Sequence, residues 1–207
     1  MVAYARVMTT APRRRGRPPR SSPAAVEAVA LGLMLRDGYE AATVEAISDA
    51  AGVGRTTFFR YFGSKSGVVW AEFERAIERL RNGLEVPGAA TIMRTVQAAV
   101  VESTVEARDA SDSWLARFVL LDRDPALTGE AAAHWQAWAA TIAAYVEDRG
   151  AAASTRALAA AIGGAVQAVY VVVLRDWSSS SLAEVDVDDL RLALEPLVKA
   201  FDDLLRS

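Results

Sequence analysis

The sequence predicts an all-α fold of about nine helices, with a small N-terminal head and a larger C-terminal body. Apolar residues recur at spacings of three and four along most of the chain, which is the period of a helix with one buried face. No stretch alternates for long between apolar and polar residues, so we expect essentially no sheet. Capping residues, prolines and glycines stand where helices would begin and end. The helices are expected at residues 23–37, 44–51, 55–62, 64–84, 90–109, 113–121, 125–149, 154–176 and 188–205.

The first three helices are delimited by short polar and glycine signals. Ser22 and Pro23 form an N-cap and a first helical residue, and Gly38 ends this helix. Thr43 is a suitable N-cap for the second helix, and Gly52 can adopt the left-handed backbone angles that close it. Two short helices around a glycine turn are typical of a helix-turn-helix unit.

The third helix would present a polar face once its phenylalanines are buried. Phe58 and Phe62 are four residues apart and should both point inward. Arginine binds guanine edges or phosphates, threonine reaches a phosphate or a thymine methyl, and tyrosine donates to a phosphate. Ser64 should cap the next helix, with Lys65 in its first turn, where a nearby phosphate would explain a cation. The residues left for a DNA surface are Arg55, Thr56, Thr57, Arg60, Tyr61 and Lys65. The alternative is a generic helix pair that binds nothing.

The segment resembles the DNA-binding domain of TetR-type transcriptional regulators over about residues 26–81. The family pattern is a small or polar residue, Thr, an aromatic or Leu, Tyr, any residue, Tyr or His, and Phe. Here it appears as TTFFRYF at 56–62, and the family's lysine follows at Lys65. The resemblance places the family's DNA contacts on Thr43, Arg55, Thr57, Arg60, Tyr61 and Lys65.

Two positions depart from the family pattern. Phe59 stands where the family usually has a tyrosine, so one hydroxyl contact to phosphate should be missing. Gly54 stands where a serine or threonine often caps the recognition helix. The continuation through residues 58–81 also resembles an actinobacterial subgroup that includes the regulators of mycofactocin gene clusters.

The N-terminal segment is strongly basic. Residues 1–22 contain six arginines and no acid, a charge of +6, so the rest of the chain must carry −9 to give the net −3. We expect residues 1–21 to form a disordered arm, because the stretch RRRGRPPR is rich in proline and glycine. The stretch resembles short arms that lie in A·T-rich minor grooves, with Arg13, Arg14, Arg15 and Arg17 as the contacts. The alternative is a solubilising tail.

The last two helices predict self-association. The helix at 154–176 is apolar on nearly every side and needs cover all round, and Gly163 and Gly164 would let another backbone approach. The resemblance implies a homodimer paired through this helix and the one at 188–205, which would read an inverted repeat. The alternative is a helix buried within one monomer. Pro196 should kink or split the last helix.

Large aromatic side chains are concentrated in the middle helices. Ordinary core packing explains any one of them. The resemblance implies an inducer cavity there, and an apolar, tryptophan-lined cavity suits a small hydrophobic or aromatic effector, such as a fatty-acyl compound. The candidate lining residues are Trp70, Phe73, Met93, Trp114, Phe118, Leu121, Trp135, Trp138 and Tyr170, and Tyr145 belongs to the same aromatic set. His134 is either a polar handle in the cavity or a partly exposed helix residue.

Composition argues against an enzyme and against a membrane or secreted protein. The chain has no cysteine and one histidine, and it shows no paired-carboxylate, phosphate-loop or metal-spacing motif, so we expect no cofactor and no metal. The most apolar run, 157–174, is broken by Gly163, Gly164 and Gln167, whereas a membrane span needs roughly 20 continuous apolar residues, so we expect this run in the protein interior. No apolar stretch follows the N-terminal arginines, so a secretory signal is not expected and the cytoplasm is the simplest location.

These patterns predict a ligand-responsive transcriptional regulator, most simply a repressor that a small hydrophobic effector releases from its operator. The expected domains are the arm at 1–21, the helix-turn-helix domain at 22–66 and the effector-binding and dimerisation domain at 67–207. The alternative is a helical acyl-binding or structural protein that has lost specific DNA binding.

Overall fold

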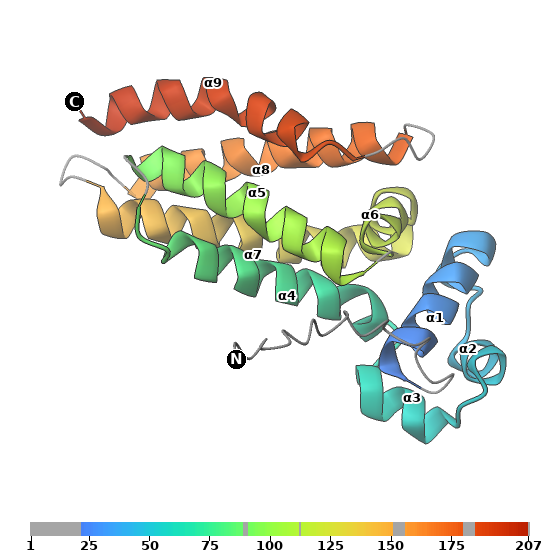
Figure 1. Cartoon of the computed structure of the whole chain (residues 1–207). Helices are drawn as coiled ribbons and strands as arrows, with labels where there is room; N and C mark the ends of the chain where they lie inside the picture. The colour runs from blue at the N-terminus through green and yellow to red at the C-terminus, as the bar shows by residue number, and fades with distance from the viewer. Residues whose placement is uncertain (1–21, 89–90, 112, 151–155, 180–184, 207) are drawn as a thin grey trace, which may run out of the picture.

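The computed structural model describes residues 22–88, 91–111, 113–150, 156–179 and 185–206, and within them the chain forms nine helices and no strand. The first three helices form a head at one end of a bundle of the other six (Figure 1). The all-α prediction is therefore confirmed. The helices are α1 (Pro23–Asp37), α2 (Val44–Ala51), α3 (Arg55–Phe62), α4 (Gly67–Leu84), α5 (Ile92–Ala110), α6 (Trp114–Arg123), α7 (Pro125–Arg149), α8 (Arg156–Ser179) and α9 (Val187–Arg206).

The predicted N-caps form the expected hydrogen bonds. The Ser22 hydroxyl accepts from the backbone N–H of Ala25 at 3.2 Å, and the Thr43 hydroxyl accepts from Ala46 at 3.1 Å. The carboxylate of Asp124 accepts from the N–H of Ala126 at 3.0 Å at the start of α7. These side chains satisfy backbone donors that the first helical turn leaves without partners, which is why the bounds of α1, α2 and α7 could be predicted.

The predicted start of α4 is wrong, and of the kink or split expected at Pro196, the split does not occur. α4 begins at Gly67 and not at Ser64, because Gly63 turns the chain with φ 70°. Ser64 still caps, since its hydroxyl accepts from the N–H of Gly67 at 2.9 Å. Pro196 does not split the last helix, and α9 runs through it as one element. The proline is exposed, while Leu194 and its neighbours on the buried face hold α9 against the bundle.

The core of the head extends into the body. Met34, Ile47 and Phe58, one each from α1, α2 and α3, are fully buried together with Val68 from the first turn of α4. The same cluster includes Leu127 of α7 and neighbouring residues of α6. Because α4 contributes to this core and also runs into the bundle, it connects the head rigidly to the body.

The body packs α7 against α8, α4 against α5, and α9 against α5 and α8. α8 and α9 lie side by side along the same side of the bundle (Figure 1). The close approach of α7 and α8 depends on Gly163, where an added Cβ would lie 2.4 Å from the carbonyl oxygen of Ala139.

Replacing Gly163 by alanine should therefore lower the free energy of unfolding by about 1 to 3 kcal/mol, because the backbones of α7 and α8 would have to separate. Urea unfolding followed by circular dichroism measures the change. Gly129→Ala on the exposed side of α7 is the matched control, since its Cβ would meet no atom within 4 Å. Equal stabilities of the two variants would contradict this account of the α7–α8 contact.

Candidate nucleic-acid interface and ligand cavity

The turn between α2 and α3 has the predicted geometry. Gly52 is left-handed, with φ 67° and ψ 35°, and its N–H closes α2 on the carbonyls of Asp49 and Ser48. The N–H of Val53 also donates to the Ser48 carbonyl at 3.0 Å. This turn sets α3 across α2 and fixes which side of α3 faces outward.

α3 is anchored by one side chain. Phe58 is fully buried, and its ring packs 5.2 Å from that of Phe62, which is half-buried. Phe59, in the position of the missing tyrosine, is 41% exposed. Gly54 precedes α3 without a side-chain cap, as the sequence implied.

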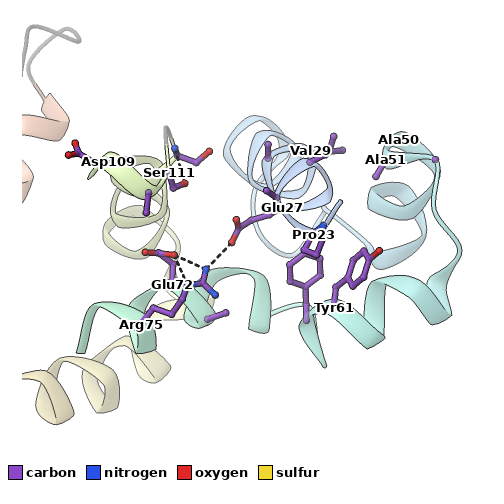
Figure 2. Close-up of a pocket in the computed structure, with 18 of the residues that line it drawn as sticks. Pro23, Glu27, Val29, Ala50, Ala51, Tyr61, Glu72, Arg75, Asp109 and Ser111 are labelled. Atoms are coloured by element: carbon purple, nitrogen blue, oxygen red, sulfur yellow. Dashed lines mark hydrogen bonds and ion pairs between the residues drawn. The ribbon is translucent and has the colours of Figure 1, made fainter. Parts of the chain in front are cut away.

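The predicted DNA-contacting side chains of α2 and α3 lie at the surface of the head. Thr43, Arg55, Thr56 and Arg60 are exposed, and Thr57 and Tyr61 are half-buried. Tyr61 turns its ring toward Phe62 and lines the cleft beside α1 (Figure 2). The arm arginines Arg13, Arg14, Arg15 and Arg17 lie outside the described residues.

Arg55 and Arg60 have contacts within the head. Arg55 Nη1 lies 2.5 Å from Glu45 Oε1 of α2, in a pair whose side chains are both more than half exposed. Such a pair contributes little to stability, so a phosphate or a base edge can replace it at small cost. The guanidinium of Arg60 lies 5.3 Å from the centre of the Tyr61 ring.

Lys65 differs most from its predicted placement. It precedes α4 instead of lying in its first turn, and its Nζ donates to the carbonyl of Tyr39 at 2.9 Å. Nζ also lies 4.1 Å from the centre of the Tyr39 ring, and Glu40 O is a weaker second acceptor at 3.5 Å. The lysine therefore braces the loop between α1 and α2 against the start of α4. No pattern in the sequence indicated this contact, because the two residues are 26 positions apart.

An aromatic cavity of about 70 Å³ lies in the body between α4, α5, α6, α7 and α8. Seven of the nine predicted lining residues border it, and Trp70 and Met93 do not. Trp70 instead donates its indole N–H to Glu130 at 2.5 Å and stacks on His134. Met93 is buried elsewhere, in the core formed with α9. The residues that do line the cavity as predicted are Phe73, Trp114, Phe118, Leu121, Trp135, Trp138 and Tyr170.

The aromatic rings of the cavity pack on one another. Trp138 and Tyr170 stack with centroids 5.1 Å apart and planes 3° apart, and Trp135 meets Phe73 edge-on at 4.8 Å. Burial raises the pKa of Tyr170, so its hydroxyl stays neutral, and it hydrogen-bonds with Thr104 Oγ1 at 3.2 Å. His134 is half-buried against Trp70 and lies outside the cavity. This placement agrees with the interpretation of His134 as a partly exposed helix residue and not as a polar group of the cavity.

No sequence pattern indicated the two charged residues that line this cavity. Glu72 of α4 and Arg117 of α6 both line it and are both buried. Burial alone would raise the pKa of Glu72, but hydrogen bonds from Arg79 and Arg75 outweigh this and lower the pKa below its ordinary value. Arg117 reaches the head, where its Nη2 lies 2.5 Å from Glu27 Oε1 of α1.

A larger open cleft of about 1330 Å³ separates α1 and α3 from the middle of α4 and the end of α5 (Figure 2). It is bordered mainly by small and charged side chains and lacks the tryptophans of the cavity. We therefore take the smaller aromatic cavity as the candidate ligand site. No group of His, Cys, Asp and Glu suited to a metal occurs in the part of the chain that the structure describes.

α8 has an uncovered apolar face. Of the described helices, it alone is long and apolar enough to cross a membrane by length and composition, a test that the core helix of a soluble protein also passes. Only 33% of its most apolar window is buried. The exposed small and apolar residues on this face of α8 are Ala157, Ala161, Gly164, Ala168 and Val172. Leu192, 70% exposed, adds an apolar side chain from neighbouring α9.

Two protein-family models match successive parts of this chain. Residues 28–71 match the family model described as bacterial regulatory proteins, tetR family, and residues 90–202 match the model of the MftR C-terminal domain. The mycofactocin biosynthesis transcriptional regulator MftR of Mycobacterium tuberculosis is 25% identical over 172 residues, which cover 81% of this chain and 87% of that protein.

Solved structures share the fold at low sequence identity. NalD, the secondary repressor of the MexAB-OprM multidrug efflux pump in Pseudomonas aeruginosa, superposes with a TM-score of 0.63 at 18% identity, over 86% of this chain and 95% of that chain. The fatty acid degradation regulator FadR from Bacillus halodurans gives a TM-score of 0.61 at 14% identity, over 84% and 94%. These likenesses concern the arrangement of helices alone.

Proposed function

This chain belongs to the tetR family of bacterial regulatory proteins, and we propose that it is a repressor that binds an inverted-repeat operator as a homodimer and is released by a small hydrophobic effector. The observation that carries the proposal is the division of α3 into two sides. Phe58 holds one side in the core, and the other side exposes Arg55, Thr56 and Arg60. Arginine and threonine on one exposed helix face are suited to a major groove. We propose no cofactor or metal for this function, no catalytic activity, and a cytoplasmic location.

The uncovered face of α8 supports a dimer. An apolar helix face in contact with water is unfavourable, and small residues such as Ala161, Gly164 and Ala168 allow a second helix to approach closely. A second copy of α8 and α9, related by a two-fold axis, would cover this face and continue the helical bundle. The two α3 helices would then meet successive major grooves about 34 to 36 Å apart.

α4 provides the connection between effector and DNA. Val68 at its start belongs to the core of the head, and Phe73 and Ala76, one and two turns later, line the aromatic cavity. The cavity of about 70 Å³ is far smaller than the roughly 300 to 1,000 Å³ of typical ligand pockets. An effector must therefore separate the stacked rings and move α4. A coupling free energy of about 1 to 3 kcal/mol would lower operator affinity about 5- to 150-fold.

The similarity to the mycofactocin regulator MftR directs the first search for an operator. We propose that the promoter of the mycofactocin biosynthesis genes is the first candidate. Selection of DNA fragments on the purified protein tests this choice without presupposing it.

Replacing Arg60 by alanine should weaken operator binding by about 1 to 3 kcal/mol and relax the preference for one base pair. Lys65→Ala should instead weaken binding to every sequence alike, because it removes the brace between Tyr39 and the start of α4 as well as a cation near the phosphates. Fluorescence anisotropy with the operator and with a scrambled duplex, at several salt concentrations, separates the two effects.

Arg81→Ala is the matched control, because Arg81 is an exposed arginine of α4 at the far end from the head. It should bind both duplexes like the unaltered protein. Unchanged binding in both Arg60→Ala and Lys65→Ala would show that the recognition surface has been assigned to the wrong face.

A further inference from the structure

We infer that the effector is a hydrophobic carboxylate, whose anionic group binds the guanidinium of Arg117 inside the cavity and displaces Glu27 of α1. The inference rests on the proposed ligand-responsive function. It adds the chemical class of the effector and the contact through which binding reaches the DNA-binding head.

Arg117 is a buried cation with unused hydrogen-bond donors. Its side chain is 5% exposed, and it lines the cavity from α6. Nη1 donates to the Ser111 hydroxyl at 3.3 Å. Nη2 forms an ion pair with Glu27 Oε1 at 2.5 Å, whereas Nε has no hydrogen-bond partner among the described residues. A buried guanidinium with unpaired N–H groups is costly, and its planar fork fits a carboxylate.

The surroundings of Arg117 favour an anion with an apolar body. Glu72 is the other charged residue of the cavity lining within the described chain, and its two oxygens already accept from Arg75 at 2.8 Å and Arg79 at 2.7 Å. Glu72 is therefore paired with Arg75 and Arg79, so that the charge of Arg117 is balanced by Glu27 of α1 and not by a residue of the cavity lining. The rest of the lining is dominated by aromatic and aliphatic side chains such as Trp138. A neutral ligand would leave the Arg117 donors unpaired, whereas a carboxylate would accept from them.

Glu27 transmits the displacement to the head. It projects from α1 toward Arg75 and Glu72 of α4 at the junction between head and body (Figure 2). Its closest cation is Arg117, and its distance to Arg75 Nη2 is 3.9 Å. When an effector carboxylate takes Arg117, Glu27 keeps only the longer contact. The α1 helix is then held less firmly against α4 and α6, and the head can change its orientation.

Paired probes test the charge requirement. Decanoate and 2-naphthoate are compared with decanamide and 2-naphthamide, which have the same apolar bodies and no charge. Binding to the full-length protein is followed by calorimetry and by the fluorescence of the cavity tryptophans. The unaltered protein should bind each carboxylate about tenfold more tightly than its amide, or better. Equal affinities, or no binding of either carboxylate, would overturn the inference.

Two substitutions with opposite expected effects separate recognition from folding. Arg117→Gln should abolish the preference for the carboxylates and leave amide binding unchanged. Glu27→Gln should increase carboxylate affinity, because the competing carboxylate is gone. Arg81→Gln, which removes an exposed arginine of α4, is the matched control and should retain the preference. If both Arg117→Gln and Glu27→Gln lowered carboxylate affinity, the Arg117–Glu27 pair would have a structural role only, and the inference would be overturned.

Measurements of operator binding distinguish a failure of the proposed function from a failure of the carboxylate inference. If the amides bind and release the protein from its operator as well as the carboxylates do, the proposed function stands and the carboxylate inference falls. If no operator can be selected, the proposed function falls, and the probe titrations still decide whether Arg117 recognises a carboxylate.

Discussion

Replacing Gly164 by glutamate is expected to give a folded monomer that binds the operator about 100- to 10,000-fold more weakly than the dimer. Gly164 is exposed on α8, and a Cβ added there meets no atom within 4 Å, so the new side chain fits within one protomer. In the proposed dimer it would place two carboxylates in an apolar interface, where each loses its hydration without gaining a partner. Light scattering after gel filtration reports the mass, and fluorescence anisotropy reports the operator affinity.

Gly129→Glu is the control for this substitution. Gly129 is also an exposed helical glycine with open space around its Cβ, but it lies on α7, away from the α8–α9 face. Gly129→Glu should remain dimeric and should retain operator affinity. A Gly164→Glu protein that stayed dimeric would remove α8 from the interface.

Replacing Phe58 by alanine should destabilise the head by about 3 to 5 kcal/mol and abolish operator binding. Phe58 is the one fully buried side chain of α3, so its loss removes the anchor that fixes the outward face of that helix. Phe59→Ala is the adjacent control. Phe59 is 41% exposed, and its loss should change the stability by no more than about 0.5 kcal/mol.

Chemical unfolding followed by circular dichroism and by tryptophan fluorescence measures both variants. The mass of Phe58→Ala in solution should still be that of a dimer, because the α8–α9 face is distant from the head. An unfolding free energy of Phe58→Ala equal to that of Phe59→Ala would contradict the role given to Phe58.

The parts of the fold that depend on local interactions could be predicted from the sequence. The hydroxyls of Ser22 and Thr43 and the carboxylate of Asp124 cap helices within three residues of themselves, so the residue type and its position were sufficient. The burial of Phe58 followed from helical spacing in the same way. The start of α4 was misplaced because the turn at Gly63, with φ 70°, continues through Ser66 before the helix begins at Gly67. The Cα of Gly67 lies so close to the Phe62 carbonyl that an added Cβ would be 1.9 Å from its oxygen.

The parts of the candidate site that depend on packing between distant helices could not be predicted. Met93 has the same apolar character as the residues of the cavity, and only the packing of α5 on α9 turns it away. Lys65 meets Tyr39 26 positions away, and Arg117 meets Glu27 across the junction of head and body. Neither contact has a spacing that a sequence pattern could show. The two charged residues of the cavity therefore emerged only from the structure.

Selection of random and genomic DNA fragments on the purified protein, at near-physiological salt, tests the central claim most directly. We expect enrichment of an inverted repeat with half-sites centred about one helical turn apart. Arg60→Ala should enrich the same repeat more weakly, with one base pair relaxed, and Gly164→Glu should lose the enrichment. Retention of DNA without an enriched motif, disappearing as salt is raised, would contradict sequence-specific regulation. It would leave only non-specific binding through basic residues.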